Sequence, residues 1–158
     1  MIDSELVGIA QISLARAPNS LCCLGLGSCV AVFLYDPDMK MGGVLHALLP
    51  NAPDEDPSPE KYADTGIRKL LYEMTSRGAK MERIVAKLVG GAQMFPNLNL
   101  KMTDIGGLNI ESARAVLRRL GVRIVAEEVK GNTGRSAFFS MEDGRVRIKT
   151  AFAQDKSI

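Results

Sequence analysis

Two stretches of this sequence carry apolar side chains at helical spacing, and short apolar segments precede, separate and follow them. The two stripes consist of Ala63, Ile67, Leu70, Leu71 and Met74, and of Ile110, Ala113, Leu117 and Leu120. The first stripe ends before Gly78 and the second before Gly121, because glycine readily terminates a helix. An apolar helix face needs a sheet or another helix to bury it. The order of elements therefore predicts a mixed α/β fold in which two main helices pack on a sheet.

The short apolar segments predict the strands of that sheet. We expect strands over residues 6–14, 30–35, 43–49, 83–89, 122–129, 136–141 and 145–152. Turn-forming residues at 36–38 predict one hairpin, and those at 142–144 predict another. Residues 130–135 would close a third hairpin or hold an anion, and we favour the hairpin. The fold class is thus α/β of the α+β kind, a compact layered fold of mixed and antiparallel β-sheet with two main helices.

The helix starts and the long loop before the second helix complete this outline. Ser58 and Asn109 are the expected N-caps of the two helices. Met94, Phe95 and Met102 lie in an otherwise polar loop, and they form a partner surface or fold back on the core. With 158 residues, 46% of them hydrophobic, we expect a single domain over residues 1–158.

Charge and cysteine content exclude several classes of function. The 20 basic and 18 acidic residues nearly cancel, so we expect no nucleic-acid partner. The longest uncharged stretch, residues 17–35, is interrupted by proline, glycine and polar residues, so we expect no membrane insertion. The N-terminus lacks the features of a secretion signal, which predicts a cytoplasmic protein. Cys22, Cys23, Cys29 and His46 do not have the spacing of metal ligands, so we expect thiols and no metal site.

The segment CLGLGSC, residues 23–29, is the most informative part of the chain. Gly25, Gly27 and Ser28 lead directly into Cys29, and such small residues let a substrate approach main-chain N–H groups closely. A thiol nucleophile beside an oxyanion pocket is built in this way. The alternative is a glycine-rich turn followed by a buried, inert cysteine, and spacing alone favours that alternative.

His46 is the only imidazole of the chain, so a histidine that assists a thiol here must be His46. The alternative is a core histidine bonded to a carbonyl group. If residues 29 and 46 belong to a hairpin with its tip near Asp38, they lie about equally far from that tip and opposite each other. This geometry makes the two interpretations about equally good. A thiol paired with an imidazole is also expected to lose its proton more easily than a free cysteine.

Several blocks of residues, in this order, resemble the CheD family of chemoreceptor glutamine deamidases. The blocks are residues 24–32, 43–50, 61–65, 90–95 (without Gln93), Asn109, Gly131-Asn132 and 134–136. The resemblance implies a layered α/β fold similar to the cysteine deamidase domain of cytotoxic necrotizing toxins. It implies Cys29 as the nucleophile, His46 as its base, and N–H groups near Gly27 and Ser28 as the oxyanion donors. It also implies conversion of receptor glutamines to glutamate without a metal or an organic cofactor.

The chain departs from this family at two positions. Cys23 stands where the family commonly has a threonine as the third catalytic residue, and Leu108 stands where it usually has an arginine. We expect the backbone carbonyl of Cys23, rather than its thiol, to orient the imidazole. The resemblance further implies a CheC-type phosphatase as a second partner. The alternatives are a non-enzymatic chemotaxis adaptor that binds receptors and such a phosphatase, and a thiol hydrolase acting on a small amide.

Overall fold

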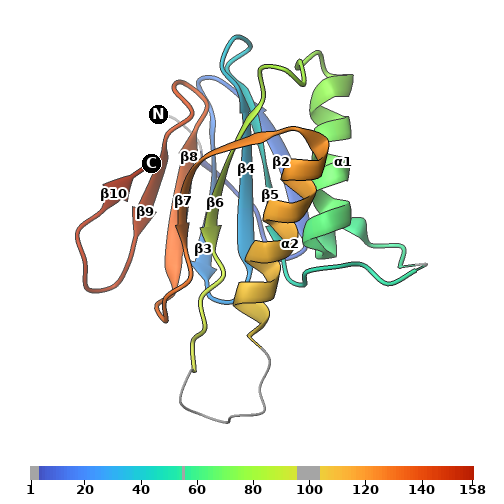
Figure 1. The fold of residues 1–158 in the computed structure, drawn as a ribbon. Coiled ribbons are helices and arrows are strands. Elements are labelled where there is room, and N and C mark those ends of the chain that lie inside the picture. Colours follow the sequence, from blue (N-terminus) through green and yellow to red (C-terminus); the bar gives the residue numbers. More distant parts are fainter. Residues whose placement is uncertain (1–3, 55, 96–103) are drawn as a thin grey trace.

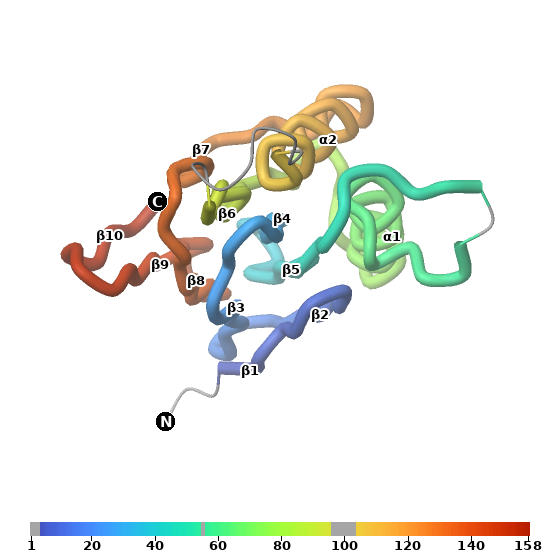
Figure 2. Tube along the Cα trace, turned by 90° about the horizontal axis from the view of Figure 1, so that it is seen from below, coloured from blue at the N-terminus to red at the C-terminus, as the bar shows by residue number. Residues whose placement is uncertain are grey.

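Two five-stranded sheets pack face to face, and two helices cover the outer face of one of them. A computed structural model describes residues 4–54, 56–95 and 104–158. Both helices lie to the right in Figure 1, and Figure 2, which looks along the layers from below, shows them on the same side of the sheets. The resulting order of layers is sheet, sheet and helices, and the two helices pack on the same sheet.

The chain crosses between the sheets several times. The central sheet, which carries the helices, has the order β2 (Gln11–Arg16), β5 (Met41–Ala47), β4 (Val30–Asp36), β6 (Val85–Gly90) and β7 (Arg123–Val129). The outer sheet has the order β1 (Ser4–Leu6), β3 (Ser20–Leu26), β8 (Arg135–Ser140), β9 (Val146–Lys149) and β10 (Lys156–Ser157). The helices are α1 (Ala63–Ser76), α2 (Ile105–Leu120) and the short 3-10 helix η1 (Pro59–Lys61).

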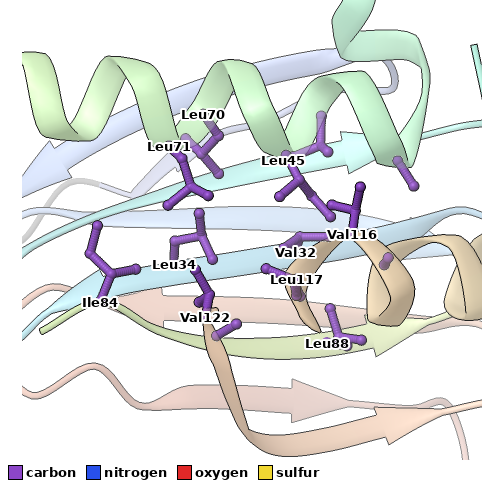
Figure 3. Close-up of a cluster of buried hydrophobic side chains, with 14 of the residues drawn as sticks. Val32, Leu34, Leu45, Leu70, Leu71, Ile84, Leu88, Val116, Leu117 and Val122 are labelled. Atoms are coloured by element: carbon purple, nitrogen blue, oxygen red, sulfur yellow. The ribbon is translucent and has the colours of Figure 1, made fainter. Parts of the chain in front are cut away.

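Strands β4 and β5, in the interior of the central sheet, are buried on both faces. Along β4, Val32 and Leu34 belong to the cluster beneath the helices, whereas Ala31 and Phe33 belong to the cluster between the sheets. A strand covered on both sides has no polar face, which explains why β4 is a continuous apolar run. Figure 3 shows the aliphatic side chains of the sheet and both helices meeting beneath the helices.

Much of the predicted outline is confirmed. The fold is mixed α/β with two main helices, the turn after Asp36 joins β4 to β5, and the turn near Gly144 joins β8 to β9. Helix α2 begins five residues before the expected position, because Asp104 is its N-cap and accepts from the N–H of Gly107 at 2.9 Å. Asn109 therefore lies inside α2 and is fully buried. Ser58 precedes η1 rather than α1, and its side chain makes no capping bond.

Three parts of the prediction are wrong. Residues 6–14 form parts of two strands in different sheets, separated by a turn at Ala10. Residues 20–26 form strand β3, in which Gly25 has a φ of +63° within an irregularity between Cys23 and Leu26. The glycines there favour a turn, and pairing with two distant strands overrides that local preference. Residues 130–135 form no hairpin, because β7 and β8 belong to different sheets.

Among the described residues, no helix is long and apolar enough to cross a membrane.

Candidate active site

Cys29 and His46 lie at the end of the β4–β5 hairpin that is remote from its turn. His46 is directly opposite Ala31 in the ladder, and Cys29 immediately precedes β4. Cys29 and Ala31 both belong to the cluster between the sheets, so His46 shares their face. Cys29 and His46 are therefore diagonal neighbours rather than opposite residues; in antiparallel ladders such neighbours lie up to about 7–8 Å apart. The difference from the expected pairing arises because the register is set by a hairpin tip between Asp38 and Met39.

A backbone carbonyl fixes the orientation of His46. The imidazole is 3% exposed, and its Nδ1 lies 3.0 Å from the carbonyl oxygen of Val7. Because a carbonyl only accepts, Nδ1 carries the proton and Nε2 carries the lone pair. Val7 is itself held, since its N–H donates to the carbonyl of Cys22 at 2.8 Å. The orienting carbonyl thus belongs to the segment between β1 and β2, and the expectation that Cys23 supplies it is wrong.

Burial keeps both members of the pair neutral. It lowers the pKa of His46, and the bond to Val7 opposes this shift. It raises the pKa of the Cys29 thiol, against a smaller opposite effect of the Cys29 N–H. Both shifts oppose the expectation of an easily ionised thiol. The physical reason is that a neutral imidazole supplies no positive charge to stabilise a thiolate.

Gly27, Ser28 and Cys29 form a short segment, here called the Cys29 loop. The carbonyl group of each of these residues accepts a hydrogen bond. The carbonyl of Gly27 accepts from the N–H of Ala92 at 2.9 Å, and that of Cys29 accepts from the N–H of Gly91 at 2.8 Å. The carbonyl of Ser28 accepts from the side-chain amide of Asn109 at 2.8 Å. Three consecutive peptide groups are thus held in place by the segment after β6 and by α2.

A pocket of about 190 Å³ opens beside Ser28. It is lined by Ser28, Ala92, Gln93, Met94, Phe95, Asp104, Ile105 and Gly106. Met94 and Phe95 are 40% and 62% exposed, which favours the partner-surface interpretation of this segment. Met102 lies outside the described residues. The exposed side chains of Met94 and Phe95 therefore form an apolar surface directly beside the Cys29 loop.

Cys23 belongs to the same buried cluster as Cys29, and its side chain is fully buried. Burial, together with the neighbouring Cys22 and Cys29, raises the pKa of its thiol to about 12. The Cys23 side chain is therefore a neutral thiol next to the site.

The sequence-based analysis missed the contribution of two buried polar side chains. The guanidinium of Arg135 donates to the carbonyls of Gly90, Glu128 and Lys130, and so joins the start of β8 to the ends of β6 and β7. Asn109 donates both to the Cys29 loop and to the segment after β5. A usable signal was present for Asn109, because it lies four residues before Ala113 on the apolar face of the second helix.

Comparisons with known proteins show the family to which the chain belongs. Residues 48–150 match the family model described as CheD chemotactic sensory transduction. The chain is 46% identical over 147 residues to a probable chemoreceptor glutamine deamidase CheD of Desulforamulus reducens, covering 91% of this chain and 89% of that protein. The chain belongs to the CheD family.

Two other members of the CheD family match this chain over about nine tenths of its length. The chain is 37% identical to the chemoreceptor glutamine deamidase CheD of Thermotoga maritima, covering 92% of this chain and 90% of that protein. It is 44% identical to a probable CheD deamidase of Caldanaerobacter subterraneus subsp. tengcongensis, covering 91% of each chain. The crystal structure of the Bacillus licheniformis hypothetical protein YfiH matches with a TM-score of 0.48 and 18% identity, covering 74% of this chain and 49% of that chain.

Proposed function

We propose that this CheD-family chain, as a single deamidase domain over residues 1–158, converts glutamine side chains of methyl-accepting chemotaxis receptors to glutamate through Cys29 and His46. The observation that carries this proposal is the bond from His46 Nδ1 to the Val7 carbonyl on the face that also holds Cys29. This bond presents Nε2 as a base beside a thiol, the arrangement that activates a cysteine nucleophile.

The reaction is an acyl transfer from a primary amide. His46 Nε2 takes the proton of the Cys29 thiol while Sγ attacks the carboxamide carbon of the receptor glutamine. The imidazolium then donates this proton to the leaving nitrogen, the C–N bond breaks, and ammonia departs from the thioester. Water attacks the thioester with His46 again as base, and the C–S bond breaks to give glutamate and the free thiol. In sum, glutamine and water become glutamate and ammonia.

The N–H groups of Gly27, Ser28 and Cys29 are the proposed donors to the oxyanion of both tetrahedral intermediates. The carbonyls of Gly27 and Ser28 share their peptide groups with the N–H groups of Ser28 and Cys29. Because these carbonyls accept from Ala92 and Asn109, the orientation of the Ser28 and Cys29 N–H groups is fixed before substrate binds. Donors that need no reorganisation stabilise developing charge most effectively. Cys23 has a supporting role, as a neutral thiol that fills the core beside Cys29.

Two further features belong to the proposal. The protein acts in the cytoplasm, on the cytoplasmic parts of the receptors, and needs neither metal nor organic cofactor. A CheC-type phosphatase is its second partner, and the exposed Met94 and Phe95 beside the pocket are available for contacts with either protein.

Mass spectrometry of a purified receptor fragment incubated with the protein in heavy-oxygen water tests this function. We expect particular glutamines to become glutamates that each carry one heavy oxygen, because water opens the thioester. Binding of the fragment without conversion would instead support the adaptor alternative. Hydrolysis of free glutamine, with receptor glutamines left intact, would support the small-amide hydrolase.

A further inference from the structure

Asn109 connects the two segments that carry the reactive groups. Its side chain is fully buried, and its Nδ2 donates to the carbonyl of Ser28 at 2.8 Å and to the carbonyl of Leu48 at 3.1 Å. Ser28 immediately precedes Cys29, and Leu48 follows His46 by two residues. One amide group of α2 thus spans the nucleophile loop and the end of the strand that carries the base.

Packing alone does not account for an asparagine at this position. Its Oδ1 is buried and has no hydrogen-bond partner among the residues that the structure describes, which lowers stability relative to a satisfied side chain. An apolar side chain of similar size would remove this unpaired oxygen. It would also leave the carbonyls of Ser28 and Leu48 without their donor. The two bonds from Nδ2 are therefore the feature that only an amide supplies here.

We propose that Asn109 is a positioning residue for deamidation. Its amide sets the separation between the Cys29 loop and the strand end carrying His46, and so the approach of Sγ to Nε2. The inference rests on the proposed roles of Cys29 and His46. Asn109 touches neither reacting group, and acts only through the two carbonyls.

Ser112 offers a matched control three residues further along α2. It is 8% exposed, and its hydroxyl lies 2.7 Å from both the carbonyl of Pro50 and the Oδ1 of Asn51. Ser112 therefore ties the same helix to the same chain segment after β5, but it has no bond to the Cys29 loop. Loss of its hydroxyl removes comparable polar contacts without loosening the nucleophile.

The first measurement compares steady-state kinetics of Asn109→Leu and Ser112→Ala on a receptor fragment. We expect Asn109→Leu to lower kcat by about tenfold to a hundredfold with little change in KM, since small misplacements of reacting groups have effects of this size. Ser112→Ala should leave kcat within about twofold of the wild type. Equal losses of kcat in the two variants, or full activity of Asn109→Leu, would overturn the inference.

The second measurement is alkylation of Cys29 by iodoacetamide, which needs no receptor. His46→Ala alone should slow alkylation. Combined with Asn109→Leu it should have no further effect, because the Cys29 thiol and the His46 imidazole no longer meet in that variant. Additive effects of the two substitutions would contradict a positioning role. If Asn109→Leu does not fold, Asn109→Ala is measured and judged by the same criteria.

These outcomes are separable from failure of the proposed function. If Cys29→Ala still deamidates the receptor fragment, the proposed function is wrong and the kinetic comparison loses its basis. If Cys29→Ala is inactive and Asn109→Leu is as active as Ser112→Ala, only the role of Asn109 is wrong.

Discussion

The two ends of the β4–β5 hairpin differ in the charge of their buried polar groups. At the turn end, Asp36 is fully buried and keeps its charge. It accepts bonds from the Arg83 guanidinium and from the N–H groups of Asp38, Met39 and Lys80. Burial alone would raise the pKa of Asp36, but these bonds outweigh it and lower the pKa.

The open end holds reactive groups that are neutral and incompletely paired. Burial raises the pKa of Cys29 and lowers that of His46, and Asn109 leaves its Oδ1 without a described partner. One hairpin thus keeps the charge of Asp36, whose carboxylate oxygens are fully hydrogen-bonded, and keeps Cys29 and His46 neutral where the reaction is to begin. The turn end should therefore determine stability, and the open end should determine activity.

The sharpest test of this division is Cys29→Ala. We expect deamidation to fall by at least about a thousandfold, because no other group replaces the thiol nucleophile. The free energy of unfolding should change by less than about 1 kcal/mol, since a thiol is replaced by a small apolar group. Receptor deamidation and urea unfolding measure the two effects.

Cys22→Ala is the matched control for Cys29→Ala. Cys22 has the same 7% exposure as Cys29 but points to the opposite face of β3 from Cys23. Cys22→Ala should keep its activity, and its free energy of unfolding should also change by less than about 1 kcal/mol. A Cys29→Ala protein that unfolds, or a receptor that is still deamidated by it, would contradict this division between stability and activity.

Asp36→Ala should have the reverse effect at the turn end. We expect the free energy of unfolding to fall by about 2–4 kcal/mol, because the substitution leaves buried N–H groups and Arg83 without their acceptor. Activity measured well below the melting temperature should persist. Asp38→Ala is the control, since Asp38 also contacts Arg83, at 3.6 Å, but is 68% exposed and should contribute less than about 1 kcal/mol.

The dependence of stability on pH checks the charge on Asp36. A carboxyl with a lowered folded pKa contributes stability that is complete above its unfolded value and is lost as the pH falls through the folded one. The difference in unfolding free energy between wild type and Asp36→Ala should thus be constant from about pH 5 to 8 and shrink below about pH 4. A difference that does not shrink in acid would show that Asp36 is not a buried charge.

The pH dependence of Cys29 alkylation tests whether Cys29 and His46, at the open end of the hairpin, are neutral. Because burial raises the pKa of this thiol, we expect its rate with iodoacetamide to rise steadily from about pH 7 to 9. Cys29 should still react faster than Cys23, whose pKa is raised to about 12. His46→Ala should slow the reaction by removing the base. A rate already constant at neutral pH would instead indicate a thiolate–imidazolium pair.

The smallest expected effect is at Cys23. Because the carbonyl of Val7 orients His46, both Cys23→Thr and Cys23→Ala should change kcat by less than about threefold. Receptor deamidation by the two variants, with thermal melting as the folding control, measures this. A large loss in Cys23→Ala with normal folding, restored in Cys23→Thr, would assign the side chain at this position a direct part in the reaction.

Local features of the sequence were sufficient for the helices, two hairpin turns and the choice of candidates. The apolar stripe that contains Ile67 and Leu70 repeats within one helix, and the residues after Asp36 favour a turn wherever they occur. His46 was identified because the chain has no other imidazole. These inferences depend only on residues that are close together in the chain.

Only the tertiary structure decided how the site is built. Strand β3 forms against β1 and β8, and the chain crosses between sheets at residues 130–135, through pairing with distant segments. The carbonyl of Val7 that orients His46 has no side-chain signature, since every residue has a carbonyl. The pKa directions of Cys29 and His46 follow from burial, which is set by the packing of whole layers. Such properties arise from contacts between remote parts of the chain, so no local pattern could reveal them.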